Sequence, residues 1–168
     1  MASVLTRSVR AARRFRASPE RVFAAWIDPV LARRWLFATA LCPIAEVELD
    51  VRPGGSFRFV DRRGSAMVEY HGDYLIVDPP RRLTFTLLLE GLSPALTHVV
   101  VEFDRTPHGS LLALVHEHVS RERAGDVEGR WCGMLYGLAE TLESTPTREP
   151  RTRRSLPFSP TAAYRSAP

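Results

Sequence analysis

The 168-residue sequence contains no lysine, asparagine or glutamine, and all 23 of its basic residues are arginines. The absence of lysine excludes Schiff-base enzymes, P-loop nucleotide-binding proteins and protein kinases, since each needs a lysine in its site. Long apolar runs are also missing, and none approaches the roughly 18 to 20 residues of a membrane span. We therefore expect a protein that acts without a membrane.

Cysteine is scarce, because the chain has only Cys42 and Cys132, far apart in the sequence. Their separation matches neither a metal-binding nor a redox motif, so we interpret both as buried thiols in a reducing compartment. The N-terminal segment is rich in arginine but lacks the apolar stretch of a secretory signal. Together these features predict a cytoplasmic protein.

The net charge of +4 is concentrated at the C-terminal end of the chain. Residues 1–145 hold 18 arginines and 18 acidic residues, whereas residues 146–168 hold five arginines and only Glu149. The neutral body therefore gives no indication of nucleic-acid binding. We predict one domain over 1–145 and a disordered tail, rich in Arg, Pro and Ser, over 146–168, with its arginines in solvent.

Hydrophobic periodicity predicts the order of secondary structure. A strand near 3–15 is followed by two short helices, which begin at the Ser-Pro of 18–19 and the Asp-Pro of 28–29. From about residue 45 apolar residues alternate with polar ones, and short turns separate six successive strands, which indicates an antiparallel meander. Helical spacing returns after Asp126, a predicted N-cap, with Trp131, Leu135, Leu138 and Leu142 on one face.

This order resembles the α+β helix-grip fold, in which a curved antiparallel sheet wraps around a long C-terminal helix and two short helices follow the first strand. Local motifs resemble the activator of heat-shock-protein ATPase homologue-like family of the START-like (SRPBCC, birch-pollen-allergen-like) superfamily. These motifs are ASPERVF at 17–23, WIDP at 26–29, RW at 34–35, RPGGSF at 52–57, DPPRRL at 78–83, HE at 116–117 and EGRWCGMLYGL at 128–138.

Two departures from the family pattern lie near the expected mouth of a cavity. Many relatives carry a second tryptophan and a glycine after the equivalent of Trp35, where this chain has Leu36 and Phe37. An additional residue, Arg130, separates Gly129 from the helical tryptophan. The identity of the ligand is therefore not carried over from the family.

The resemblance implies a cavity beneath the C-terminal helix that binds an apolar or amphipathic small molecule without catalysis. It implies no cofactor and no metal, and it leaves two alternatives. These are stimulation of a heat-shock chaperone ATPase and a cavity enzyme of the cyclase or hydrolase type. The residues expected to contact the ligand are Trp35, Phe57, Phe59, Tyr70, Tyr74, Phe85, Leu112, Leu114, His116, Trp131, Leu135 and Leu138.

Histidines and acids supply the few candidates for chemistry. Alternation places His116 and His118 on one strand face, a spacing that suits a metal with a third ligand from His71, His98 or an acid. The favoured interpretation is instead a pair of hydrogen-bonded histidines, with His116 facing the cavity. In the strand over 66–78, we expect Glu69, His71 and Asp73 on the solvated face, and Val68, Tyr70, Tyr74 and Ile76 on the inner face.

Three glycines, Gly129, Gly133 and Gly137, recur at every fourth position of the C-terminal helix, opposite its apolar face. Each costs about 1 kcal/mol relative to alanine in a helix interior. One interpretation is a tolerated defect on a solvated face. The other is a flat surface on which the same helix of a second subunit packs, giving a homodimer.

Overall fold

The computed structural model describes residues 5–39, 44–89 and 96–146, so the tail predicted over 146–168 lies outside the described residues except for Pro146. The elements are β1 (Thr6–Phe15), α1 (Pro19–Ile27), α2 (Pro29–Ala32), β2 (Ile44–Leu49), β3 (Ser56–Arg63), β4 (Ala66–Asp78), β5 (Arg82–Leu89), β6 (Thr97–Thr106), β7 (Gly109–Ser120) and α3 (Ala124–Ser144). Among the described residues, no helix combines the length and apolar character needed to cross a membrane.

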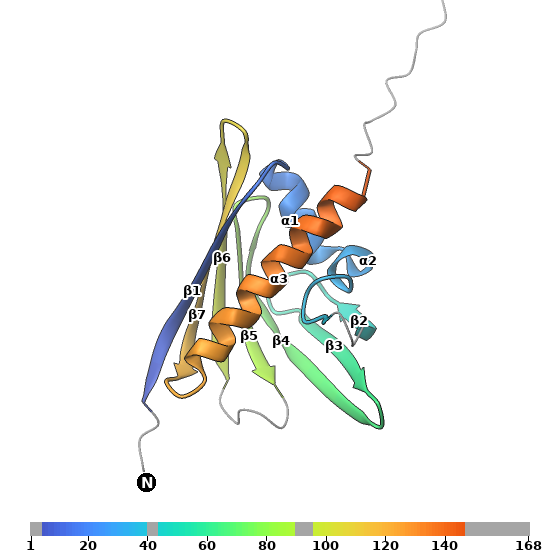
Figure 1. Cartoon of the computed structure of the whole chain (residues 1–168), viewed down its shortest axis with the longest axis vertical. Helices are drawn as coiled ribbons and strands as arrows, with labels where there is room; N and C mark the ends of the chain where they lie inside the picture. The colour runs from blue at the N-terminus through green and yellow to red at the C-terminus, as the bar shows by residue number, and fades with distance from the viewer. Residues whose placement is uncertain (1–4, 40–43, 90–95, 147–168) are drawn as a thin grey trace, which may run out of the picture.

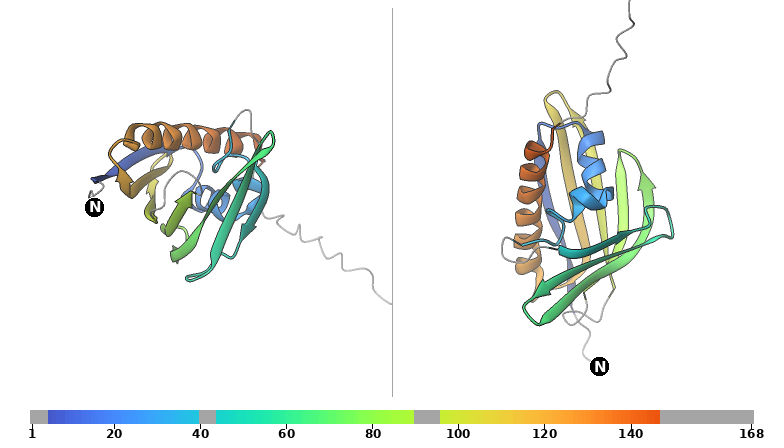
Figure 2. Two further views of the ribbon diagram at one scale, coloured as in Figure 1. Left: turned by 90° about the horizontal axis from the view of Figure 1, so that it is seen from below. Right: turned by 90° about the vertical axis from the view of Figure 1, so that its right-hand side faces the viewer.

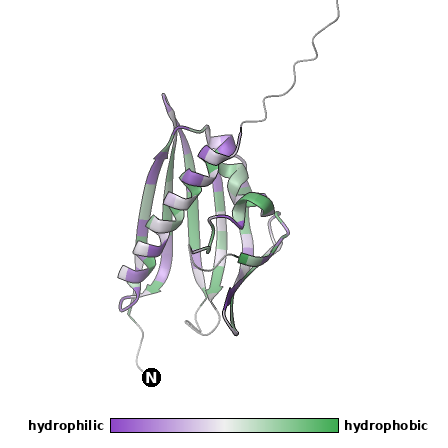
Figure 3. Cartoon of the chain, turned by 45° about the vertical axis from the view of Figure 1, so that its right-hand side comes forward, coloured by the Kyte–Doolittle hydropathy of each residue, from purple (hydrophilic) through white to green (hydrophobic). Residues whose placement is uncertain are grey.

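The seven strands form one antiparallel sheet in the order β1-β7-β6-β5-β4-β3-β2. The sheet is curved, and α3 lies along its concave face while α1 and α2 cover the rest of that face (Figures 1 and 2). Buried apolar residues of the strands, of α1 and of α3 form one core, and the ribbon of α3 is largely polar or neutral on the side seen in Figure 3. The predicted helix-grip fold is thus confirmed.

The two short helices begin where the sequence predicts. The Ser18 hydroxyl accepts a hydrogen bond from the Arg21 amide at 3.4 Å, and the Asp28 carboxylate accepts one from the Val30 amide at 2.8 Å. The long helix begins earlier than predicted: α3 starts at Ala124, which is fully buried. Asp126 therefore lies in the first turn and is not the N-cap; its negative charge there interacts favourably with the positive end of the helix dipole.

Aromatic side chains fill the space between the sheet and one end of α3. Trp26 lies at their centre, with ring centroids 4.7 Å from Trp35 and 6.2 Å from Phe85, Phe103 and Trp131. The indole N–H of Trp35 donates to the backbone carbonyl of Ala25 at 3.1 Å, so this buried polar group is satisfied. This aromatic cluster anchors α1 and α3 on the sheet.

Two irregularities in the strands overturn predictions that rested on strict alternation. The register of β1 and β7 shifts between Arg7 and Val9, and His118 on the opposite strand has φ 63°. His116 is buried while His118 is exposed, so the two histidines do not share one face. A second shift follows Tyr74 in β4 and leaves Ile76, predicted to be inward, 41% exposed.

Two predictions about α3 need correction. Gly129 and Gly133 face open space, but an added Cβ at Gly137 would lie 3.5 Å from the Cβ of Trp35, so the three glycines do not form one outward surface. Trp35 causes the difference, because the segment after α2 packs against that turn of α3. Cys132, predicted to be a buried thiol, is exposed because it lies on the outer side of α3; Cys42 lies outside the described residues.

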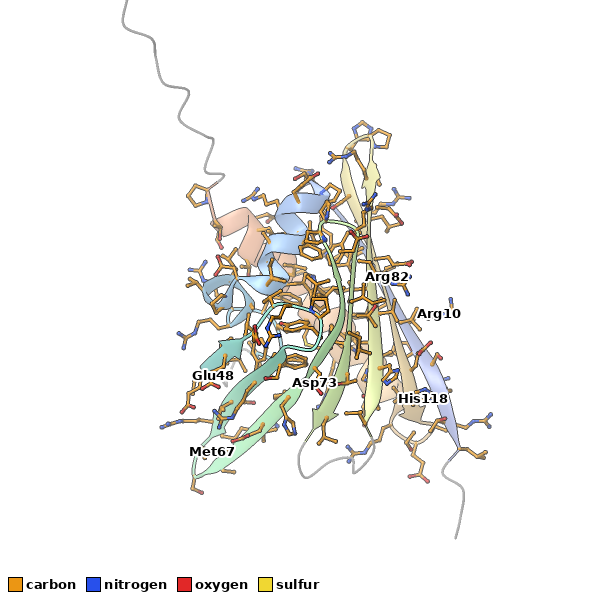
Figure 4. All side chains as sticks on the ribbon, turned by 180° about the vertical axis from the view of Figure 1, so that it is seen from behind. Arg10, Glu48, Met67, Asp73, Arg82 and His118 are labelled. Atoms are coloured by element: carbon orange, nitrogen blue, oxygen red, sulfur yellow. The ribbon has the colours of Figure 1, made fainter. Side chains whose placement is uncertain are left out.

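The two edge strands carry opposite charges. Along β1 the exposed side chains include Arg7, Arg10 and Arg14, whereas β2 exposes Glu46 and Glu48. Arg10 and Glu48 lie at opposite edges of the sheet in Figure 4. The interior strands are paired on both sides by their neighbours.

Candidate functional site: an apolar cavity beneath α3

A cavity of about 110 Å³ lies between the N-terminal half of α3 and the sheet. Its walls are mostly apolar, and its exposed residues, His118, Arg123 and Arg130, mark the side that opens to solvent. The lining residues come from the segment after α2, from four strands and from α3: Phe37, Tyr70, Leu87, Thr97, His116, His118, Val119, Ser120, Arg123, Val127, Arg130 and Trp131.

A chain of three hydrogen bonds crosses one wall of the cavity. The indole N–H of Trp131 donates to Nδ1 of His116 at 3.1 Å, and Nε2 of His116 lies 2.8 Å from the Thr97 hydroxyl. The Thr97 hydroxyl donates to the backbone carbonyl of Leu87 at 2.8 Å, so it must accept from Nε2. These bonds fix the neutral Nε2–H tautomer and engage both ring nitrogens of His116.

Burial reinforces the neutral state of this histidine. It disfavours the charged imidazolium and lowers the pKa of His116 to about 4. The neutral ring links α3 to β6 and β7 through Trp131 and Thr97. A group held in this way acts as a structural polar bridge and has no nitrogen left over for a ligand or a reaction.

Among the buried polar residues of the cavity, Tyr70 keeps an unused donor. Its ring stacks on Phe37 with a centroid separation of 4.4 Å, and its oxygen accepts a weak bond from Arg63 at 3.4 Å. The fully buried Asp61 holds Arg63 in place with a contact of 2.8 Å. Among the described residues, no hydrogen bond uses the Tyr70 proton, which is therefore available to a molecule in the cavity.

The pKa of the Tyr70 hydroxyl is raised, chiefly because burial disfavours the phenolate. The positive charges of Arg63 and Arg130 act in the opposite direction. The phenol therefore stays protonated at neutral pH and can donate. Arg130 is exposed at the mouth and near enough to Tyr70 for its charge to influence that hydroxyl.

The structure brings together three of the twelve residues predicted to contact a ligand, since Tyr70, His116 and Trp131 line the cavity. Phe57, Tyr74 and Phe85 border a separate void of only about 10 Å³ near Trp26. The remaining six are buried core residues that do not line the cavity: Trp35, Phe59, Leu112, Leu114, Leu135 and Leu138. Their distance from the cavity follows from the aromatic cluster, which fills the space beneath the other half of α3.

Sequence reasoning missed most of the remaining wall. Phe37 lines the cavity, its backbone has φ 60°, and its amide lies 3.2 Å from the sulfur of Met134. Thr97 and Leu87 come from strands whose alternation marks them as inward, but nothing in the pattern distinguishes a cavity wall from a filled core. Phe37 and Arg130 did carry a signal, because both stand at the departures from the family pattern.

Two other places on the molecule differ in character from this cavity. A larger groove of about 660 Å³ lies between the end of β1 and the C-terminal end of α3, and its lining includes four arginines: Arg13, Arg14, Arg16 and Arg21. It is open and polar, unlike the apolar cavity. The acids of β4 face outward as predicted, with Glu69 paired to Arg58 at 2.6 Å and Asp73 exposed (Figure 4).

Solved structures with the same arrangement define the class of fold. A protein from Chromobacterium violaceum superposes with a TM-score of 0.74 at 23% identity, over 82% of this chain and 99% of that one. CalU16 from Micromonospora echinospora gives 0.65 at 29% identity, over 83% and 78%. The AHSA1-like protein from Aeromonas hydrophila gives 0.71 at 21% identity, over 82% and 93%. The chain therefore has the START-like helix-grip architecture.

The family follows from a match in sequence. The family model described as Activator of Hsp90 ATPase homolog 1-like protein matches residues 16–143, and the chain belongs to that family. A search among curated proteins gave no match.

Proposed function

We propose that the protein binds a small amphipathic molecule, with its apolar part in the cavity beneath α3 and its polar end at the mouth. The observation that carries this proposal is the arrangement of the lining. Phe37, Leu87, Val127 and Trp131 supply the apolar wall, and the exposed Arg123 and Arg130 stand at the opening. Such pockets, apolar with a few convergent polar groups, are common small-molecule sites.

The polar contacts indicate the kind of end group. The Tyr70 hydroxyl offers one donor, and the guanidinium of Arg130 offers several with a positive charge. His116 contributes none, because both of its nitrogens are engaged. The mouth therefore favours an acceptor such as a carboxylate or a carbonyl oxygen, in place of the His116 contact that the sequence suggested.

The cavity volume limits what enters. An engineered apolar cavity of about 150 Å³ holds benzene, so 110 Å³ accommodates a group somewhat smaller than a phenyl ring without movement of the walls. A longer ligand must extend through the mouth or move Phe37 and Val127. This favours a slim apolar end joined to an exposed polar group.

The test uses short carboxylic acids of increasing chain length, with the matching amides, titrated by the change in tryptophan fluorescence. We expect saturable binding of the acids that is weaker for the amides. Leu87→Phe should fill the cavity and abolish binding, while Tyr70→Phe should lower affinity about fivefold through the loss of one hydrogen bond. Tyr136→Phe, at an exposed tyrosine on α3, is the matched control.

A second pair of variants, each of which removes one arginine, tests the role of charge at the mouth of the cavity. Arg130→Ala should weaken binding of the acids more than that of the amides, whereas Arg121→Ala, exposed and outside the lining, should leave both unchanged. Equal affinity in wild type and Leu87→Phe would show that the probes bind elsewhere and would contradict the proposal.

The family description supports a second candidate, stimulation of a heat-shock chaperone ATPase. This function requires a stable complex with the chaperone and faster ATP hydrolysis, and both are measurable with the purified proteins. Either function suits the cytoplasmic location that the sequence predicts. A hydrolase or cyclase is less well supported, because the most buried histidine has no free nitrogen.

A further inference from the structure

Two histidines and a glutamate meet on the outer side of the sheet, away from the aromatic cluster. His98 on β6 lies directly opposite Glu117 on β7 in the antiparallel register, and His118 follows in the chain. The side chain of His118 lies on the outer face of the sheet, near the end of β7 (Figure 4). Directly paired residues have Cβ atoms about 5 Å apart, so His98 and Glu117 are neighbours by construction.

The bulge in β7 adds the third side chain. In a regular strand, consecutive residues point to opposite faces, and His118 would point inward with His116. The register shift leaves Glu117 and His118 together opposite Ser8, and φ 63° at His118 redirects its side chain. A histidine in this left-handed region is uncommon, and the strained backbone brings the imidazole beside Glu117 and His98.

The three side chains are arranged closely enough to share an ion. One ligand atom from each lies within 4.8 Å of the others, and the imidazole rings of His98 and His118 are 5.7 Å apart in an edge-to-face arrangement. Zinc binds imidazole nitrogen at about 2.0 Å and carboxylate oxygen at about 2.0 to 2.2 Å. Ligand atoms around one zinc are thus about 3 to 4 Å apart, which small side-chain rotations achieve from the observed positions.

No competing partner occupies these groups in the part of the chain that the structure describes. Neither Glu117 nor the two imidazoles enters a hydrogen bond or ion pair there, whereas other outward-facing acids such as Glu69 are paired with arginine. A half-buried carboxylate between two half-buried or exposed imidazoles is a set of three ready ligands.

We propose that His98, Glu117 and His118 bind Zn²⁺ or a divalent cation of similar chemistry, with water in the remaining position. Two imidazoles and one carboxylate suit zinc, while calcium and magnesium prefer oxygen ligands throughout. This site differs from the His116–His118 pair considered from the sequence, because His116 is held inside by Trp131 and Thr97. It also departs from the expectation of a protein without metal. Its argument does not rest on the proposed cavity ligand, although His118 also stands at the mouth of the cavity.

The experiment is calorimetric titration of the full chain, with Cys42 and Cys132 replaced by serine so that thiols do not bind zinc. Zn²⁺ should bind with a stoichiometry of one, and Mg²⁺ should not bind. His118→Asn removes one ligand at the lowest backbone strain, because asparagine tolerates the left-handed region. Outer-shell changes alone weaken metal sites about 10- to 100-fold, so this variant and Glu117→Gln should each lower zinc affinity at least tenfold.

His108→Asn is the matched control, since His108 is also exposed but lies in the turn between β6 and β7. It should bind zinc as the parent does. Replacement of zinc by Co²⁺ gives a visible absorption band that reports nitrogen ligation and should disappear in His98→Ala. Zinc affinity that is unchanged in His118→Asn and Glu117→Gln, or lost equally in His108→Asn, would overturn the proposal.

Discussion

The two halves of α3 lie on the same sheet, but the space beneath one half is filled by aromatic side chains and the space beneath the other contains a cavity. Beneath the C-terminal half, α1 and the segment after α2 insert Trp26 and Trp35, and the ring of Trp26 packs edge to face with Trp35 and with the strand residue Phe103. Beneath the N-terminal half none of the described helices is inserted, and an apolar cavity of about 110 Å³ remains. The cavity is therefore the part of the space between helix and sheet that the two short helices and the residues after them do not fill.

The largest expected contrast comes from two leucines on β5. Leu83 is buried in the packed half, and Leu87, four residues along the strand, lines the cavity. Leu83→Ala should lower the free energy of unfolding by about 3 to 5 kcal/mol, because a new void forms in tight packing. Leu87→Ala only enlarges an existing void and should cost about 2 kcal/mol. Urea unfolding at neutral pH measures both, and equal costs would contradict the distinction.

Acid should destabilise the cavity half through His116. Its pKa is about 4 in the folded protein and about 6.5 when unfolded, so below pH 6.5 the unfolded chain binds a proton that the folded protein does not. Stability is therefore complete above pH 6.5 and falls by about 3 kcal/mol as the pH drops to 4. His116→Leu should remove this part of the pH dependence; an unchanged slope would show that other groups cause it.

Thr97→Val tests the hydrogen-bonded wall at nearly constant volume. The change removes the acceptor for His116 and the donor to the Leu87 carbonyl, so we expect a loss of about 2 kcal/mol. Thr84→Val is the control, because the buried Thr84 hydroxyl makes only a long contact of 3.5 Å with Arg82. Similar losses in thermal or urea unfolding would mean that the bonded chain adds no stability.

The smallest effect belongs to the outer face of α3. Gly133→Ala adds a Cβ into open space and should stabilise the protein by about 0.5 to 1 kcal/mol through helix propensity. Sedimentation of Gly133→Leu tests the homodimer interpretation of this face. If wild type and Gly133→Leu are both monomers, the glycine is only a weak helix former. A wild-type dimer that the leucine dissociates would support packing of a second subunit on this face of α3.

Much of the fold was predictable because each element carries a local signal. Ser18 and Asp28 cap the short helices, and the strand limits at 66–78 follow from alternation and the proline pair that ends it. The candidate site was less predictable. Tyr70, His116 and Trp131 were anticipated as inward residues, but inward position is shared by the filled core and the cavity wall.

What could not be predicted depends on backbone irregularity and on contacts between distant segments. The bulge at His118 and the shift before Ile76 each interrupt an alternation that continues without a break in the sequence. The hydrogen bond from Trp131 to His116 joins α3 to β7, and hydrophobic periodicity within each element gives no information on contacts between them. Positive φ at Phe37 and His118 gives no compositional signal, since neither residue is a glycine or an asparagine.

The charges on the two edge strands govern how copies of the protein meet. An open sheet exposes unpaired backbone groups on β1 and β2, which are templates for aggregation through added strands. Two β1 edges bring rows of arginine such as Arg7, Arg10 and Arg14 together, and two β2 edges bring Glu46 and Glu48 together. Like edges therefore repel each other, so these charges disfavour symmetric pairing of two β1 edges or two β2 edges, most effectively at low ionic strength.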